Sequence, residues 1–200
     1  MLNILLLGPQ GSGKGTQAKL IHGTYGLAHI ATGDMIREIK ELPTDLGREL
    51  KAVYDRGDLV SDELMIRLIE DRLSRGDTLP GFILDGYPRT MPQAEALDEL
   101  LHQLERTLDV VFAFQVPDRQ ALLDRMVKRA AEENRSDDTP EAIERRLELY
   151  ERETAPLVEY YRSTRGNVVG IHAERTVGDV FQEIRDTLDQ VQRRRNGEAA

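Results

Sequence analysis

The chain has 200 residues, enough for one domain with a sizeable core and small insertions but not for two independent cores. With 40% hydrophobic residues, 32% charged residues and no cysteine, the composition excludes a disordered chain, a disulfide framework and a thiolate metal site. The formal net charge of -9 disfavours nucleic acid and anionic membranes, so an anionic ligand needs a local cluster of positive charge.

The sequence shows no targeting or membrane signal. Met1 passes into a short apolar run without a basic leader, and no apolar run approaches the roughly 18 residues of a spanning helix. We therefore expect a cytoplasmic protein that binds neither membrane nor nucleic acid. The four histidines show no ligand spacing, so we interpret them as structural or surface residues.

Short apolar runs alternate with helical patterns along the chain. The apolar runs end at Leu7, Ile30, Leu84, Gln115 and Ile171. Helical patterns cover residues 14–24, 34–42, 44–56, 61–75, 92–106, 118–131, 139–162 and 177–194. This alternation predicts an α/β fold with a parallel sheet covered by helices.

Three segments stand apart from this alternation. No strand signal occurs between Thr32 and Leu79, so the helices there form an inserted unit. The polar segment from Ala130 to Asp138, which includes Asn134, predicts a short exposed lid between two helices. The tail from Arg193 to Ala200 lacks apolar periodicity and is expected to be frayed.

The segment from Gly8 to Lys14 reads GPQGSGK, which is the spacing of a phosphate-binding P-loop between a strand and a helix. Glycines let the backbone approach phosphate oxygens, and Lys14 can reach the β- and γ-phosphates. Gly15 stands where a metal-binding hydroxyl is usual, so Thr16 would have to supply it. The alternative is a glycine-rich turn with a solvated lysine.

A carboxylate ends the third apolar run. Asp85 follows Gly81 to Leu84, as a Walker-B aspartate does when it holds or orients Mg²⁺. A strand-ending aspartate can also be a helix cap, but the P-loop favours the metal role. The turn from Gly86 to Arg89 presents an arginine beside this carboxylate, where it could face a phosphate.

Arginines supply the candidate anion cluster. Arg125 and Arg129 lie one helical turn apart, an arrangement that either an anion or nearby Glu132 and Glu133 could relieve. Arg135 could pair with Asp137 or Asp138, and Arg37 with Glu41 in a surface pair. Arg146 falls on the apolar face of its helix without a carboxylate at helical steps. It therefore predicts either a bound phosphate or an ion pair to another element.

Four motifs in order, Gly8 to Gln17, Thr32 to Arg37, Asp85 to Thr90 and Arg135 to Asp138, closely resemble those of the adenylate kinase family. The likeness covers nearly the whole chain, and the Gly-Lys-Gly-Thr variant at residues 13–16 fits it. It implies a three-layer α/β/α P-loop kinase fold with a five-stranded parallel sheet. The core would span residues 1–30, 61–127 and 139–200, with a nucleoside-monophosphate-binding insertion at residues 31–60 and a lid at residues 128–138.

The resemblance also implies the site residues. On the ATP side they are Gly11, Ser12, Gly13, Lys14, Gly15, Thr16, Arg129 and Arg175, to which the residue pattern adds Arg125. On the AMP side they are Thr32, Arg37, Leu59, Val60, Ser61, Gly86, Tyr87, Pro88, Arg89, Gln93, Arg135 and Arg146. The residues assigned to catalysis are Lys14, Asp85, Arg89, Arg129, Arg135 and Arg146.

Departures from the family pattern are small. The lid is short and lacks the cysteines that hold zinc in some relatives, so no structural zinc is expected. Ala31 and Tyr87 replace the commoner Ser and Phe. Thr32 and Thr90 favour AMP over pyrimidine monophosphates, which relatives accept with Ala and Asn there.

These features predict a monomeric adenylate kinase that transfers the terminal phosphoryl group of ATP to AMP with Mg²⁺, which Asp85 holds through water. Alignment and charge neutralisation would drive the step, since the AMP phosphate needs no general base. Two alternatives remain: a UMP/CMP kinase of the same fold, and a P-loop nucleotide switch or sensor that lacks an acceptor site.

Overall fold

A single five-stranded sheet organises the computed structural model, which describes residues 1–133, 135 and 137–197. All neighbouring strands pair in parallel, in the order β2-β3-β1-β4-β5. The strands are β1 (Leu2–Leu7), β2 (Ala28–Ala31), β3 (Gly81–Asp85), β4 (Val110–Gln115) and β5 (Val168–His172). Each predicted apolar run forms one strand, and the predicted fold class is confirmed.

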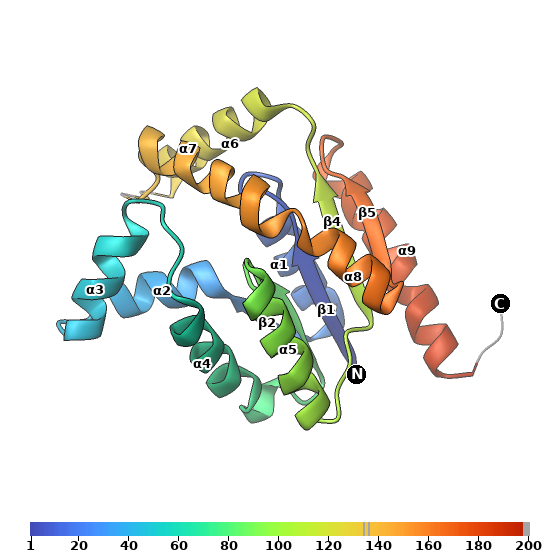
Figure 1. Cartoon of the computed structure of the whole chain (residues 1–200). Helices are drawn as coiled ribbons and strands as arrows, with labels where there is room; N and C mark the ends of the chain where they lie inside the picture. The colour runs from blue at the N-terminus through green and yellow to red at the C-terminus, as the bar shows by residue number, and fades with distance from the viewer. Residues whose placement is uncertain (134, 136, 198–200) are drawn as a thin grey trace.

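Helices fill the intervals between the strands (Figure 1). They are α1 (Lys14–Tyr25), α2 (Thr32–Lys40), α3 (Asp45–Tyr54), α4 (Asp62–Leu73), α5 (Met91–Gln103), α6 (Arg119–Glu132), α7 (Pro140–Leu149), α8 (Leu157–Arg165) and α9 (Val177–Arg195). Within the described residues, no helix is both long and apolar enough to span a membrane.

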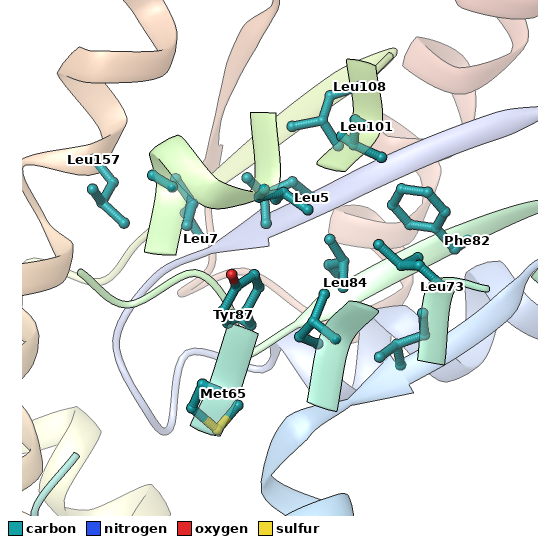
Figure 2. Close-up of a cluster of buried hydrophobic side chains, with 14 of the residues drawn as sticks. Leu5, Leu7, Met65, Leu73, Phe82, Leu84, Tyr87, Leu101, Leu108 and Leu157 are labelled. Carbon is teal, nitrogen blue, oxygen red and sulfur yellow. The ribbon is translucent and has the colours of Figure 1, made fainter. Parts of the chain in front are cut away.

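Alternate side chains of the strands face opposite layers of helices. Leu5 and Leu7 of β1 belong to a cluster completed mainly by α4, α5 and α8, part of which Figure 2 shows. Ile4 and Leu6 belong to a second cluster completed by α1 and α9. Because both faces of the sheet are covered, its strands are apolar at successive positions, and these two clusters hold the sheet between two helical layers.

The helix predicted over residues 139–162 is interrupted. A π-turn spans Tyr150–Thr154, where the Ala155 N–H donates to the Tyr150 carbonyl at 2.8 Å, and Pro156 follows. Pro156 lacks the N–H that a continuous helix would use. The apolar spacing continues through the interruption, which is why the pattern predicted one helix. The π-turn places Tyr150 and Thr154 at a cleft in the molecular surface.

The C-terminal tail is more ordered than expected. Helix α9 continues through Arg195, whose guanidinium lies 2.9 Å from an oxygen of Asp109. The prediction of a frayed tail is therefore wrong for residues 193–195. The tail's last residues, 198–200, lie outside the described residues, as do Asn134 and Ser136 of the predicted lid and family motif.

The parallel strands place all their carboxyl ends at one edge of the sheet. The chain builds β2 and β3 on one side of β1 and then β4 and β5 on the other. Ligands of such sheets bind where the strand order reverses, at the carboxyl ends. The loop after β1 lies at this position.

Candidate active site

A cleft of about 790 Å³ opens at the carboxyl edge of the sheet. Of the residues predicted for the nucleotide and metal sites, it is lined by Gly11, Ser12, Gly13, Lys14, Gly15, Thr16, Arg37, Leu59, Asp85, Gly86, Pro88, Arg89, Arg125, Arg129, Arg135, Arg146 and Arg175. Thr32, Val60, Ser61, Tyr87 and Gln93 do not line it. The topology thus gathers most of the predicted residues, while their roles in binding stay predictions.

The loop between β1 and α1 has the backbone geometry of an anion site. Gly13 precedes α1 with a φ of 89°, in the left-handed region that glycine tolerates best. A side chain at Gly11 would place its Cβ 2.9 Å from the Leu122 carbonyl oxygen. The first turn of α1 carries no acidic residue, so the positive end of its dipole faces the cleft without a competing carboxylate.

Lys14 lies across this loop. Its Nζ donates to the carbonyls of Gly8 at 2.6 Å and Pro9 at 2.7 Å. Burial, with smaller effects from the charges of Arg89 and Arg129, lowers the pKa of Lys14 to about 8 despite the opposing charge of Asp85. An anionic ligand would favour the charged form of this amine.

Asp85 ends β3 beside the loop. A Cβ built on Gly15 would lie 3.4 Å from Asp85 Oδ2. Burial alone raises the pKa of this carboxyl, but His29 and the charges of Lys14 and Arg89 outweigh it and hold the pKa below its ordinary value. An ionised carboxylate, the Thr16 hydroxyl and space for water fit a hard cation such as Mg²⁺. Among the residues that the structure describes, no group of three or more His, Cys, Asp or Glu could hold a metal.

His29 has a neighbour that its sequence position does not indicate. It lies on β2, lines the cleft, and places Nε2 3.5 Å from Asp85 Oδ2. Sequence spacing could not reveal this neighbour, because the two residues are joined only by the pairing of β2 with β3. His29 therefore belongs to the surroundings of the metal-side carboxylate.

Arg89 is a half-buried cation that lines the cleft. Its Nε donates to the Gly86 carbonyl at 2.8 Å, and no carboxylate among the described residues lies within ion-pair distance. Burial lowers the pKa of Arg89, so the guanidinium carries an unfavourable desolvation energy that an anion would offset. Glycine is required at position 86 just before this residue, because φ is +88° and a Cβ there would lie 2.6 Å from Thr32 Oγ1 and 3.3 Å from the Arg89 guanidinium.

Arg37 has partners other than the predicted one. It binds the Asp34 carboxylate and donates to the Tyr54 hydroxyl at 2.9 Å, whereas the predicted partner Glu41 lies 3.9 Å from Lys51. Asp34 lies three residues before Arg37 on α2, and Arg37 pairs with it rather than with Glu41 four residues after. The sequence gives no sign of this role for Tyr54, because its spacing from Leu50 on α3 indicates only a core residue.

Of the two predictions for Arg146, a bound phosphate or an ion pair, the structure shows an ion pair. Its guanidinium binds Asp138, donates to Asp137 at 3.0 Å and to the Tyr54 carbonyl at 3.1 Å. The guanidinium also lies 4.9 Å from the centroid of the Tyr54 ring. Asp137 is 2% and Asp138 7% exposed, so the prediction of an exposed lid is wrong at these two residues.

Arg146 keeps capacity for a ligand. Three of the five guanidinium N–H donors are used in these bonds, and Arg146 lines the cleft. Within the described part of the chain, two donors remain for an anion. The carboxylates therefore orient Arg146 and offset its charge.

The other arginines are also held by the protein. Arg129 donates to Asp138 at 2.7 Å, and Arg125 donates to the Ala173 carbonyl at 3.1 Å. Arg135 donates to Glu133 at 2.5 Å, so its predicted pairing with Asp137 or Asp138 does not occur. Both aspartates are instead turned inward toward Arg146. Arg175 binds Glu183 on α9.

Comparison with known proteins decides the family. The model of the family described as Adenylate kinase matches residues 6–166. The chain belongs to the adenylate kinase family. The resemblance inferred from the four motifs is thereby confirmed.

Relatives in this family match along nearly their whole length. An adenylate kinase of Cyanothece sp. is 44% identical over 96% of this chain and 97% of its own. One of Bifidobacterium longum is 48% identical over 90% and 94%, and one of Rhizobium meliloti 45% over 94% and 100%. Membership makes the chain a nucleoside-monophosphate kinase with adenylate kinase function, ATP + AMP = 2 ADP.

Proposed function

We propose that this reaction takes place in the cleft between the loop at Gly11 to Thr16, which receives the ATP phosphates, and the Arg89 turn, which receives AMP. One observation carries the proposal: Lys14 and Arg89 are half-buried cations that line the same cleft, and burial lowers the pKa of each. A switch protein needs cations only for its bound nucleotide. A second cation in the same cleft, here Arg89, supports the binding of a second phosphate group, that of the acceptor.

The proposed ATP side comprises the loop, two arginines of α6 and one arginine after β5, namely Gly11, Ser12, Gly13, Lys14, Gly15, Thr16, Arg125, Arg129 and Arg175. The proposed AMP side comprises Thr32, Arg37, Leu59, Val60, Ser61, Gly86, Tyr87, Pro88, Arg89, Gln93, Arg135 and Arg146. Thr32 is buried and donates to the Asp85 carbonyl at 3.3 Å, which favours a supporting role over direct contact.

The chemical step needs charge stabilisation and alignment. An oxygen of the AMP phosphate, whose second pKa is near ~6, attacks the γ-phosphorus of ATP as a dianion. The bond from phosphorus to the β–γ bridging oxygen breaks, and ADP leaves with the electron pair. Lys14, Arg89, Arg129, Arg135 and Arg146 would stabilise the charge on the transferred group.

Mg²⁺ would be held between the nucleotide phosphates, the Thr16 hydroxyl and Asp85 through water. When bound, it neutralises charge on the β- and γ-phosphates. Asp85 is suited to this because its lowered pKa keeps it ionised at neutral pH. His29, beside the carboxylate, fixes its surroundings.

Residues 31–60 and 128–138 are proposed to act as insertion and lid that close over the nucleotides and exclude water. Contacts between these segments support this, since Lys40 of α2 lies 3.8 Å from Asp137. We also propose a monomer in the cytoplasm, which is consistent with the absence of a membrane-spanning helix among the described residues.

A coupled assay tests the proposed function. We expect ADP to form from ATP, Mg²⁺ and AMP, with kcat/KM higher for AMP than for CMP, UMP or GMP. A clear preference for CMP would favour the UMP/CMP kinase alternative. ATP binding without phosphoryl transfer to any monophosphate would favour the switch or sensor. The same assay serves as the reference for every variant below.

Binding of ATP is expected to draw a proton onto Lys14. Because the pKa of Lys14 is about 8 in the free protein and phosphate raises it, ATP binding at pH 8.5 should take up protons, and affinity should fall about tenfold from pH 7 to 9. Calorimetry in buffers of different ionisation enthalpy measures this uptake. The Lys14→Met variant should show none, and equal uptake in both proteins would contradict the assignment.

A further inference from the structure

The carboxylate of Asp62 joins two segments of the proposed AMP site, and no role has been assigned to it. Asp62 is half-buried at the first position of α4, directly after the segment from Leu59 to Ser61. Its Oδ1 accepts a hydrogen bond from Thr90 Oγ1 at 2.8 Å and another from Gln93 Nε2 at 2.7 Å. Both donors belong to the segment that leads from β3 into α5.

These bonds fix the orientation of the Gln93 amide. Gln93 is only 2% exposed, and its Oε1 accepts a hydrogen bond from the Arg89 backbone N–H at 2.8 Å. Exchanging the two ends of the amide would place Nε2 against an N–H donor and Oε1 against a carboxylate. Both contacts would be repulsive, so Asp62 selects one orientation.

A relay of hydrogen bonds thus runs from Asp62 through the Gln93 amide to the backbone of Arg89. The other side of that backbone is held as well, because Thr154 Oγ1 donates to the Arg89 carbonyl at 2.8 Å. Arg89 itself carries no ion pair among the described residues, so its position depends on such backbone contacts. Loss of the carboxylate would free the amide and loosen the Arg89 turn.

We propose that Asp62 is a positioning residue for AMP, which sets the Gln93 amide and the Arg89 backbone in the arrangement that receives the monophosphate. This inference rests on the proposed function. It also predicts an effect on base selection, because the same carboxylate holds the hydroxyl of Thr90, a residue that the sequence connects with the preference for AMP. Asp62 acts through its neighbours and takes no part in the chemical step.

The neighbouring Glu63 provides a matched control. It lies in the same first turn of α4 and is exposed, 4.0 Å from Arg67. Both acids favour the helix N-terminus electrostatically. If Asp62 only stabilised the start of α4, Glu63 would have the same effect. Of these two acids, however, only Asp62 contacts Thr90 and Gln93.

The test compares steady-state kinetics of Asp62→Ala, Asp62→Asn and Glu63→Ala. Asp62→Ala is expected to raise KM for AMP about tenfold while KM for ATP stays within about twofold, and to reduce the preference for AMP over CMP. Asp62→Asn should recover most of the loss, because its amide oxygen can still accept from the same donors. Glu63→Ala should match the wild type.

A folded Asp62→Ala variant with unchanged KM for AMP and unchanged preference would overturn the proposal, as would equal changes in KM for ATP and AMP. If Asp62→Ala does not fold, Gln93→Glu decides. That variant places two carboxylates next to each other and should raise KM for AMP. Adding Asp62→Asn removes one of these charges and should lower KM again. If the two substitutions instead change KM additively, the relay is contradicted. A wild-type chain that forms no ADP contradicts the proposed function instead.

Discussion

An Arg89→Ala variant is expected to turn over at least about 10²-fold more slowly than the wild type while keeping its fold. The guanidinium is desolvated, and the carboxylates of the described residues lie outside ion-pair distance, so the protein leaves its charge for a ligand. Removing it takes away stabilisation of the transferred phosphoryl group. The fold should persist, because the backbone contacts of Arg89 with Gln93 and Thr154 do not use its side chain.

The measurement is kcat at saturating ATP and AMP, with two further variants as controls. Arg89→Lys keeps the charge but loses the planar fork that matches phosphate, so only part of the rate should return. Arg162→Ala removes an exposed arginine that pairs with Glu159 on the surface, and it should leave kcat unchanged. Turnover of Arg89→Ala near the wild-type value would remove this residue from the mechanism.

Features that depend on short stretches of chain could be predicted from the sequence. The P-loop and Asp85 were identified because each follows a continuous apolar run, and such runs become the central strands of the sheet. Parallel pairing then brings the ends of β1 and β3 together at one edge. The sequence predicts a parallel sheet but not its strand order, because pairing between distant strands leaves no mark on any short stretch of chain.

Partners that arrive from other elements could not be predicted in the same way. Helical spacing predicts no carboxylate partner for Arg146 on its own helix, but Asp137 and Asp138 lie just before α7 and reach it through a turn. His29 meets Asp85 across paired strands. Periodicity reports contacts within one element, so it is silent on contacts that the tertiary fold creates.

Arg146→Ala is expected to lower stability as well as turnover, unlike Arg89→Ala. The substitution leaves the buried carboxylates of Asp137 and Asp138 without their main cation. Removing one partner of a buried ion pair costs about 3 kcal/mol, which corresponds to a fall in Tm of roughly 6–12 °C for a chain of this size. Thermal and chemical unfolding of the purified variant measure both quantities.

The pH dependence of this loss identifies its cause. Burial alone raises the pKa of Asp137, but Arg146 and Lys40 outweigh it and hold the pKa below its ordinary value of 3.8. A lowered carboxyl pKa contributes stability above the ordinary value and loses it as pH falls through the folded-state pKa. The difference in unfolding free energy between wild type and Arg146→Ala should therefore shrink below about pH 4.

The adjacent Arg145 is the matched control for this prediction. It pairs with Asp58 at 3.1 Å, but its side chain is 44% exposed, and such surface pairs contribute about 0–1 kcal/mol. Arg145→Ala should therefore shift Tm by a few degrees at most and leave kcat unchanged. Equal losses of stability in the two variants would show that the buried carboxylates do not depend on Arg146. A difference confined to Arg146→Ala that fades in acid ties its stabilising role to Asp137 and Asp138.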